Sequence, residues 1–251
     1  MPFSHNYGGL LRPKTRVVAL ADFWRCTALV VLNSPDRSLS NEQVHGLASA
    51  CGFVVAADGG ANWLRGTNVR PNVLVGDLDS VEDETRSFYE KSSVLCQSDP
   101  DESRNDFQKA LTCLPDAFQR AVVIGGDGGR FDHLLANIHA MYADAMHHQH
   151  RDVVLLSSKS MAFVLRPGGH TIHIDECVEG PSCGMFPMGG PCNVRTRNLQ
   201  WDVNSEGWNG RPLEFGSFIS SSNRILGNSV LIWTDAFLLW THEVRWPSPG
   251  G

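Results

Sequence analysis

The sequence predicts two domains: an N-terminal three-layer α/β domain with a mainly parallel sheet, and a C-terminal β-sandwich. Strand-like and helix-like segments alternate as far as about residue 158, which is typical of a parallel sheet covered by helices on both faces. Beyond that residue, short β-like segments separated by glycine and proline follow one another closely, which favours a sandwich or a barrel. In the first half, aspartate-bearing turns follow the predicted strands, and open α/β sheets bind ligands at the carboxyl ends of their strands.

The elements of the first domain follow from local patterns. Short apolar runs read as strands, and apolar residues spaced three and four apart read as one face of a helix. Ser40 belongs to a residue type that caps helix N-termini, and Phe107, Ala110, Leu111 and Leu114 share one face of a later helix. The expected strands are 27–32, 53–57, 73–75, 94–96, 121–124 and 153–156, and the expected helices are 40–50, 82–91, 106–114 and 131–147.

The second domain is expected to consist of short strands. We place the domain boundary near residues 157–160, so that the α/β domain spans 26–158 and the sandwich spans 159–246. Residues 1–25 are expected to form a poorly ordered or loosely packed leader. The expected strands of the sandwich are 161–165, 171–174, 184–187, 192–196, 216–220 and 229–233.

Composition narrows the range of functions. A net charge of −6 without any basic run argues against a nucleic-acid partner. No stretch approaches the length of a membrane span, so no membrane partner is expected, and the N-terminus carries no secretory apolar region. The seven cysteines are scattered and include no C-x-x-C pair, which predicts reduced thiols and a cytoplasmic protein.

The aspartates after the predicted strands suggest a metal site. Asp77 and Asp79 follow an apolar run at i and i+2 spacing, which puts both on one side if the backbone stays extended. Asp58 and Asp106 follow in similar contexts. Carboxylates gathered at one edge of a sheet repel one another unless a cation joins them, and hard oxygen ligands with room for phosphate suit Mg²⁺. Each of these aspartates has the alternative reading of a turn or helix cap.

A glycine-rich turn, residues 125–129, separates a predicted strand from a long helix. Glycines let backbone N–H groups approach a phosphate, and the helix N-terminus adds partial positive charge. Arg130 could pair with a phosphate through its guanidinium group, and Asp132 adds an acid beside it. The alternative is a tight turn with a surface arginine. Together, these features and the aspartates suggest a Mg²⁺-nucleotide enzyme.

The second domain has few clusters of titratable residues but several tryptophans. Most of them are expected to lie in the sandwich core or on its surface. One or two could stack on a flat, cationic or heteroaromatic ligand. The polar run 220–223 follows a predicted strand and could form hydrogen bonds to such a ring.

Taken together and in order, the motifs resemble those of the eukaryotic-type thiamine pyrophosphokinase family. The resemblance runs from about Ala28 to Trp240, and the motifs are specific as an ordered set rather than singly. The matching segments are 57–62, 75–80, 105–109, 125–126 with 129–132, 183–187, 199–202, 220–223 and 238–241.

The resemblance implies a reaction, a cofactor and an assembly. Members of the family transfer a pyrophosphoryl group from ATP to the hydroxyethyl oxygen of thiamine, and thiamine diphosphate and AMP are formed. Thiamine and ATP are therefore the expected substrates, with Mg²⁺ as cofactor. A homodimer with an active site shared between subunits is also implied, as is an α/β domain followed by a β-sandwich.

The resemblance also assigns residues to roles. Asp77, Asp79 and Asp106 are the expected catalytic residues and Mg²⁺ ligands. Two further groups of residues complete the expected site. The residues expected to bind ATP are Asp58, Gly126, Gly129, Arg130 and Asp132, and those expected near thiamine are Ser222, Asn223 and Trp240.

Three positions depart from the family pattern. Asn105 stands where threonine is expected, Glu102 stands near an expected glutamine, and Asp127 adds an acid to the glycine turn. Two alternative functions stay open on the residues alone. One is a Mg²⁺-dependent phosphohydrolase that uses the same carboxylates, and the other is a non-catalytic sensor of nucleotide or thiamine.

Overall fold

A computed structural model describes residues 3–11, 21–205 and 210–246 of the chain. Contacts within it divide the chain into two compact units. We call Pro13–Ser157 the α/β unit, and Ser158–Gly251 together with Met1–Arg12 the β unit.

The α/β unit contains six strands that all pair in parallel. Their order across this part of the sheet is β7-β6-β2-β3-β4-β5. Because both faces are covered, the central strands are apolar along most of their length, and β2 is buried at all five residues. The strands are β2 (Thr27–Val31), β3 (Phe53–Ala57), β4 (Val73–Gly76), β5 (Leu95–Ser98), β6 (Arg120–Ile124) and β7 (Asp152–Leu156).

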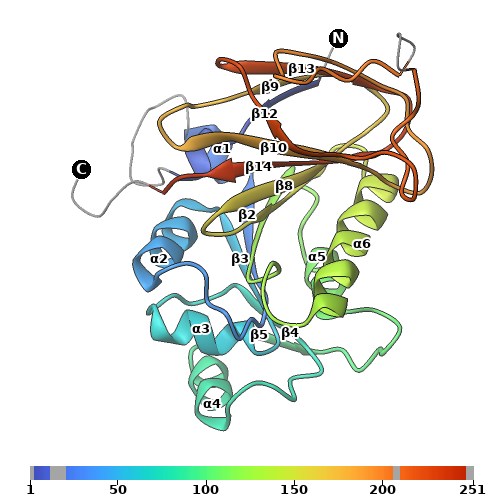
Figure 1. Cartoon of the computed structure of the whole chain (residues 1–251). Coiled ribbons are helices and arrows are strands. Elements are labelled where there is room, and N and C mark those ends of the chain that lie inside the picture. The colour runs from blue at the N-terminus through green and yellow to red at the C-terminus, as the bar shows by residue number, and fades with distance from the viewer. Residues whose placement is uncertain (1–2, 12–20, 206–209, 247–251) are drawn as a thin grey trace. The chain divides into compact units, whose positions relative to one another are not determined.

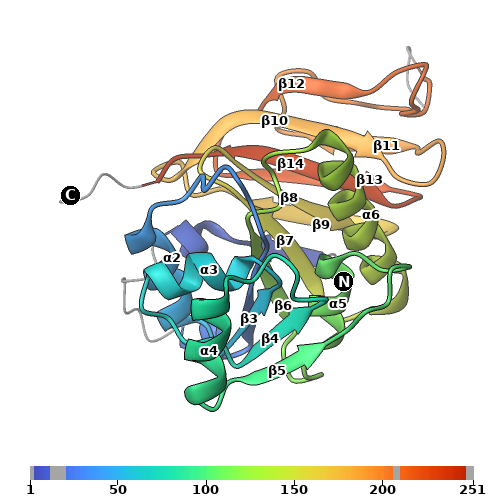
Figure 2. The same ribbon diagram turned by 90° about the horizontal axis from the view of Figure 1, so that it is seen from below.

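Helices cover both faces of this sheet, which confirms the predicted three-layer α/β arrangement. Figure 1 shows α2 and α3 on one side of the strands and α5 and α6 on the other, and Figure 2 shows the same layers from below. Both α3 and α5 contact β3. The helices are α1 (Ala21–Arg25), α2 (Asn41–Ala50), α3 (Gly60–Gly66), α4 (Asp83–Lys91), α5 (Asp106–Thr112) and α6 (Phe131–His147).

Side-chain caps fix where two of these helices begin. Ser40 caps α2, since its hydroxyl accepts a hydrogen bond from the Gln43 N–H while the Gln43 side chain accepts one from the Ser40 N–H. Asn105 and Gln108 form the same reciprocal capping box at α5. Asparagine and threonine both cap helices, so the structure gives Asn105 a structural role that the expected threonine could also fill.

The β unit contains two sheets, as predicted for a sandwich. One has the antiparallel order β12-β10-β14-β8, and the other has the order β1-β9-β13-β11. In the second sheet β1 runs parallel to β9, while the other pairs are antiparallel. The strands are β1 (Phe3–Asn6), β8 (Ser160–Leu165), β9 (Gly168–His173), β10 (Glu179–Pro187), β11 (Val194–Arg197), β12 (Ser220–Arg224), β13 (Ser229–Thr234) and β14 (Leu238–Val244).

The described part of the expected leader, residues 1–25, is folded. Phe3–Asn6 pairs with β9, and a 3-10 helix, η1 (Gly8–Leu11), follows it. Tyr7, Leu10 and Leu11 are buried in the β unit. The strand sequence Phe-Ser-His-Asn does not alternate cleanly between apolar and polar residues, so its pairing depends on β9 rather than on a local signal. The residues of this segment at 1–2 and 12–20 lie outside the described part.

Two other segments of the β unit differ from expectation. The run 220–223 is itself part of strand β12 rather than a loop after a strand, and the predicted strand 216–220 does not form: it begins in a turn, and Phe218 makes only an isolated bridge with Glu214. The segment Leu238–Val244 forms β14, which pairs with β8 and β10. Residues 238–241 form one of the family motifs, but the hydrophobic patterns of the sequence do not predict a strand there.

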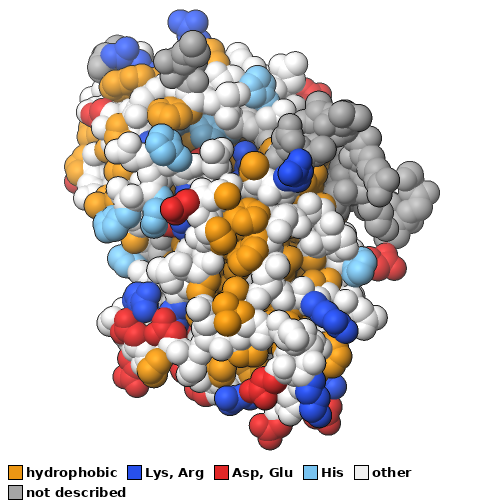
Figure 3. Space-filling model, turned by 180° about the vertical axis from the view of Figure 1, so that it is seen from behind, with side chains coloured by type: hydrophobic (Ala, Val, Ile, Leu, Met, Phe, Trp, Pro, Cys, Tyr) orange, Lys and Arg blue, Asp and Glu red, His pale blue; other side chains and the backbone are white. Residues whose placement is uncertain are grey.

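Across the described residues, no helix is long and apolar enough to span a membrane. On the face that Figure 3 shows, acidic and basic side chains are interspersed, and no broad basic surface is visible there.

Candidate functional site

A cleft of about 600 Å³ opens at the carboxyl end of the parallel strands in the α/β unit. Its walls come from the loops that follow β2, β3, β4, β5 and β6, from the first turn of α5 and from the first two turns of α6. This is the edge of the sheet where the sequence predicts a ligand site. The charged residues that line the cleft are Asp58, Asp77, Asp79, Glu102, Arg104, Asp106, Lys109 and Arg130.

Three carboxylates form the tightest group in this cleft. Asp58, Asp77 and Asp79 each offer an oxygen, and these oxygens all lie within 4.8 Å of one another. Asp58 is buried, while Asp77 and Asp79 are exposed. From the sequence, Asp58 is expected to bind ATP and Asp106 to bind the metal. The geometry groups Asp58, rather than Asp106, with the pair that follows β4.

None of these three aspartates caps a helix. The N-cap of α3 is Gly59 and that of α4 is Glu82, and neither provides a side-chain cap. Instead, Asp58 Oδ1 accepts a hydrogen bond from the Ser80 N–H at 3.3 Å, and Asp79 Oδ1 accepts one from the Ser80 hydroxyl at 2.9 Å. The cap alternative therefore does not account for Asp58 or Asp79.

Unusual backbone conformations bring the carboxylates together. Asp58 has φ of 44° and Leu78 has φ of 66°, both in the left-handed region that non-glycine residues seldom adopt. The backbone between Asp77 and Asp79 is therefore not extended, and the left-handed residue Leu78 joins them. Gly76 has φ of 147°, and a Cβ there would lie 3.0 Å from the Cβ of Asp58. Glycine is needed at this position because the two loops approach so closely.

Asp106 lies beside the cluster at the start of α5. A Cβ on Gly76 would lie 3.3 Å from Asp106 Oδ1, so the carboxyl reaches the end of β4. Burial, followed by the negative charge of Asp58, raises the pKa of Asp106. The Lys109 ammonium lies 3.7 Å from Asp106 Oδ1 and opposes that rise, and only 4% of its side chain is exposed. Asp106 is thus a half-buried carboxyl among other carboxylates, with one buried cation behind it.

The glycine turn lines the cleft through different residues than expected. Gly125 and Gly128 face it, whereas a Cβ on Gly126 would meet Leu155 at 2.7 Å, toward the core. Gly125 has φ of 80°, and a Cβ there would lie 2.6 Å from a backbone oxygen. The Gly129 N–H donates to Asp36 Oδ2 at 3.3 Å. Gly126 and Gly129, the expected ATP residues, therefore shape the turn, while their neighbours border the cleft.

Arg130 lines the cleft and pairs with Asp132. The Arg130 Nε donates to Asp132 Oδ1 at 3.0 Å, and a second bond joins Nη2 to Oδ2. Both side chains are largely exposed, so the pair holds the guanidinium in position without burying it. Asp127, inside the same turn, is half-buried, and burial raises the pKa of its carboxyl.

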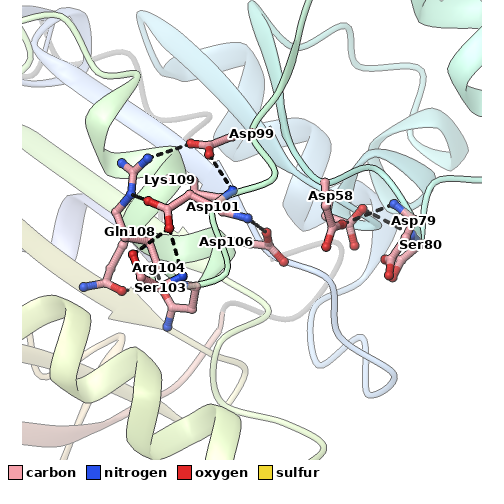
Figure 4. A network of polar contacts seen from close by, with 12 residues as sticks. Asp58, Asp79, Ser80, Asp99, Asp101, Ser103, Arg104, Asp106, Gln108 and Lys109 are labelled. Carbon is pink, nitrogen blue, oxygen red and sulfur yellow. Dashed lines mark hydrogen bonds and ion pairs between the residues drawn. The ribbon is translucent and has the colours of Figure 1, made fainter.

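A second arginine is held by two carboxylates at the loop before α5. Arg104 Nη2 donates to Asp99 Oδ2 at 2.9 Å, and Arg104 Nε donates to Asp101 Oδ2 at 2.9 Å. We call these three residues the arginine clamp. Figure 4 shows Asp106 between this clamp and Asp58. No sequence signal predicts the clamp, because its residues are ordinary ones for a polar loop.

The β unit carries a separate pocket of about 260 Å³. Asn223 lines it but is only 4% exposed, and its amide donates to the Trp201 carbonyl at 2.8 Å and accepts from the Trp201 N–H at 3.2 Å. Asn223 therefore positions Trp201, whose side chain is 58% exposed at the same pocket. Neither Ser222 nor Trp240 lines it.

Trp240 lies inside the β unit. Its side chain is fully buried, and the indole N–H donates to His242 Nδ1 at 2.8 Å. The other ring nitrogen of His242 lies 3.0 Å from Glu179 Oε1, and both of those side chains are buried. No face of the Trp240 ring is open for stacking in this structure.

Comparisons with known proteins point to one family. The family model described as "Thiamin pyrophosphokinase, catalytic domain" matches residues 44–155, and "Thiamin pyrophosphokinase, vitamin B1 binding domain" matches residues 169–239. Thiamine pyrophosphokinase 2 of Oryza sativa subsp. japonica is 32% identical over 244 residues, which cover 87% of this chain and 86% of that protein. Thiamin pyrophosphokinase 1 of Caenorhabditis elegans is 24% identical, with 88% and 90% covered.

Solved structures agree on the fold. Thiamin pyrophosphokinase from Candida albicans superimposes with a TM-score of 0.81 at 20% identity, covering 97% of this chain and 93% of that one. Yeast thiamin pyrophosphokinase gives a TM-score of 0.79 at 20% identity, with 96% and 91% covered.

Proposed function

The chain belongs to the thiamine pyrophosphokinase family, and from this we infer that it transfers the pyrophosphoryl group of ATP to the hydroxyethyl oxygen of thiamine. The products are thiamine diphosphate and AMP. The observation that carries the residue assignments is the meeting of Asp58, Asp77 and Asp79 in a cleft that the glycine turn also lines.

We propose that these three carboxylates hold Mg²⁺. Their donor atoms are hard oxygens, which this ion prefers, and three carboxylates within 4.8 Å repel one another until a cation joins them. Burial, followed by the negative charge of Asp58, raises the pKa of the neighbouring Asp106, and the second of these causes is part of that excess negative charge. When bound, Mg²⁺ would neutralise charge on the transferring phosphate oxygens.

The chain's own residues supply positioning. We propose that Arg130 and the turn at Gly125 and Gly128 hold the polyphosphate, since they line the cleft and present a cation and backbone groups. Asp132 keeps the Arg130 guanidinium oriented. Asp106 is the candidate to orient the attacking hydroxyl, and Lys109 fixes its carboxylate. Phosphoryl transfer depends mainly on such positioning and charge neutralisation.

For thiamine, we propose that the β unit contributes through the pocket at Trp201. The exposed indole offers a face for a flat ring, and Asn223 pins the backbone that carries it. The homodimer with a shared active site, and the cytoplasmic location, are also proposals that rest on the resemblance and on the free cysteines.

The test is the nucleotide product formed by purified protein with ATP, Mg²⁺ and thiamine. AMP and thiamine diphosphate that depend on both thiamine and Mg²⁺ are expected. ADP as the product would indicate an ordinary kinase, and free phosphate would indicate the phosphohydrolase. Thiamine binding without turnover would favour the sensor. Membership of the thiamine pyrophosphokinase family favours neither the phosphohydrolase nor the sensor.

A further inference from the structure

The loop before α5 forms one wall of the cleft and has a distinct charge. Glu102, Arg104 and Asn105 line the cleft next to Asp106. The guanidinium of Arg104 faces two carboxylates in the arginine clamp, at 2.9 Å each, so the clamp as a whole carries one net negative charge. Arg104 therefore adds little free positive charge to this wall, although it is one of the few cations lining the cleft.

Glu102 is the uncompensated charge of this wall. Its side chain is exposed in the cleft, and among the described residues none forms an ion pair or hydrogen bond with it. A carboxylate in this situation is solvated by water and available to a ligand that carries positive charge.

The residues on both sides of Glu102 form hydrogen bonds to the carboxylates of the clamp. On one side, the Asp101 N–H donates to Asp99 Oδ1 at 3.1 Å. On the other, the Ser103 N–H and hydroxyl donate to Asp101 Oδ1 at 2.9 and 2.6 Å. The residues that flank Glu102 are thus both tied into one polar network, which Figure 4 shows. These hydrogen bonds restrain the backbone on both sides of Glu102 without any help from a substrate, and such restraint reduces the entropic cost of binding.

This wall of the cleft is negatively charged, so it favours a cationic substrate beside it over an anionic one. ATP is polyanionic and would be repelled by Glu102 and by the net charge of the clamp, whereas Arg130 and the glycine turn offer it a favourable place. Thiamine carries a quaternary thiazolium nitrogen close to its hydroxyethyl group. We propose that Glu102, presented by the arginine clamp, determines the specificity of the acceptor site for a positively charged alcohol. The proposal rests on the proposed function and extends it.

The test compares two acceptors of the same shape and different charge. One is thiamine, and the other is its neutral analogue, in which carbon replaces the quaternary nitrogen and the ring becomes a thiophene. Steady-state kinetics with both acceptors would be measured for the unmodified protein, Glu102→Gln and Glu102→Asp. Glu42→Gln is the matched control, because Glu42 is exposed in the first turn of α2 and does not line the cleft.

Glu102→Gln is expected to raise the KM for thiamine between roughly fourfold and a few hundred-fold, the effect of one unit charge at about 5 Å as the effective dielectric constant goes from that of water to that near a protein surface. The kcat with thiamine, the KM for ATP and the constants for the neutral analogue should stay within about twofold. Glu102→Asp should restore most of the preference, and Glu42→Gln should change nothing. Added salt should raise the KM for thiamine in the unmodified protein more than in Glu102→Gln.

Two results would overturn the inference. If the ratio of kcat/KM for thiamine to that for the neutral analogue is the same in Glu102→Gln as in the unmodified protein, Glu102 does not distinguish a charged acceptor from a neutral one. An equal loss with both acceptors would assign it a general structural role. If the unmodified protein releases no AMP, the proposed function fails instead, and calorimetric binding of the two compounds to the same variants still decides the role of Glu102.

Discussion

Asp58, at the end of β3, accepts a hydrogen bond from the backbone N–H of Ser80, in the loop after β4. This bond joins the two loops that carry the carboxylate cluster, and it orients Asp58 toward Asp77 and Asp79 rather than toward α3. A residue with the sequence context of a helix cap is thereby placed among candidate metal ligands.

Replacing Asp58 by asparagine should separate catalysis from folding. The asparagine side chain keeps an oxygen for the Ser80 N–H but removes one negative charge, so we expect kcat to fall about 100-fold or more. Without Mg²⁺ the variant should be at least as thermostable as the unmodified protein, because repulsion within the cluster is relieved. AMP release and thermal unfolding, each across a Mg²⁺ titration, measure both effects, with the exposed Asp116→Asn as control. Full activity in Asp58→Asn would remove Asp58 from the metal site.

Replacing Gly76 by alanine should damage the site through the backbone. The φ of 147° strains any side chain, and the new Cβ would lie 3.0 Å from the Cβ of Asp58. We expect a loss of about 1–3 kcal/mol in the free energy of unfolding and a fall in kcat, as the carboxylates are pushed apart. Gly66→Ala is the control, because a Cβ there meets nothing within 4 Å. Denaturant unfolding and kinetics would measure both, and equal behaviour of the two variants would contradict the argument.

The pKa of Asp101 should report on the arginine clamp. Hydrogen bonds from the Ser103 side chain and backbone, followed by Arg104, lower the pKa of Asp101 from 3.8 to about 2. Because the folded value is depressed, the clamp is fully formed above about pH 4 and is lost only as the pH falls through about 2. Carboxyl NMR titration should show this value, and Ser103→Ala or Arg104→Gln should shift it back toward 3.8. If the pKa of Asp101 in the unmodified protein lies near 3.8, the clamp does not form in solution.

Replacing Trp240 by phenylalanine should affect stability rather than thiamine binding. The substitution leaves His242 Nδ1 without its 2.8 Å donor in a fully buried position. An unsatisfied buried acceptor costs about 1–3 kcal/mol, and the smaller ring adds to that loss. The KM for thiamine should stay within about twofold. If Trp240→Phe raises the KM for thiamine and leaves unfolding in urea unchanged, Trp240 contributes to the thiamine site, as the resemblance implies.

The sequence predicts the α/β unit well where local signals are strong. The strand Phe53–Ala57 and the helix Phe131–His147 have the bounds that their apolar patterns indicate. Strands β1 and β12 were missed or misplaced, since Phe-Ser-His-Asn and Ser-Ser-Ser-Asn-Arg carry little hydrophobic alternation. Their pairing partners, rather than their own residues, make them strands.

The site could be predicted only in part for a related reason. The spacing of Asp77 and Asp79 suggested a metal site, and both residues do lie in the cluster. The inclusion of Asp58 depends on its left-handed backbone and on a bond to Ser80, which no pattern within a single segment reveals. The same holds for the arginine clamp, whose three members are joined by side-chain geometry.

The carboxylate cluster draws on loops after two separate strands, with Asp106 beside it from a third segment. No short continuous peptide contains the proposed Mg²⁺ site, so on that proposal only the assembled sheet would bind the ion. Any binding free energy is then added to the free energy of folding, by about 2.7 kcal/mol when the free ion is at about 100 times its dissociation constant. The concentration of free Mg²⁺ would thus set how long the protein survives proteolysis and heat, as well as how fast it turns over.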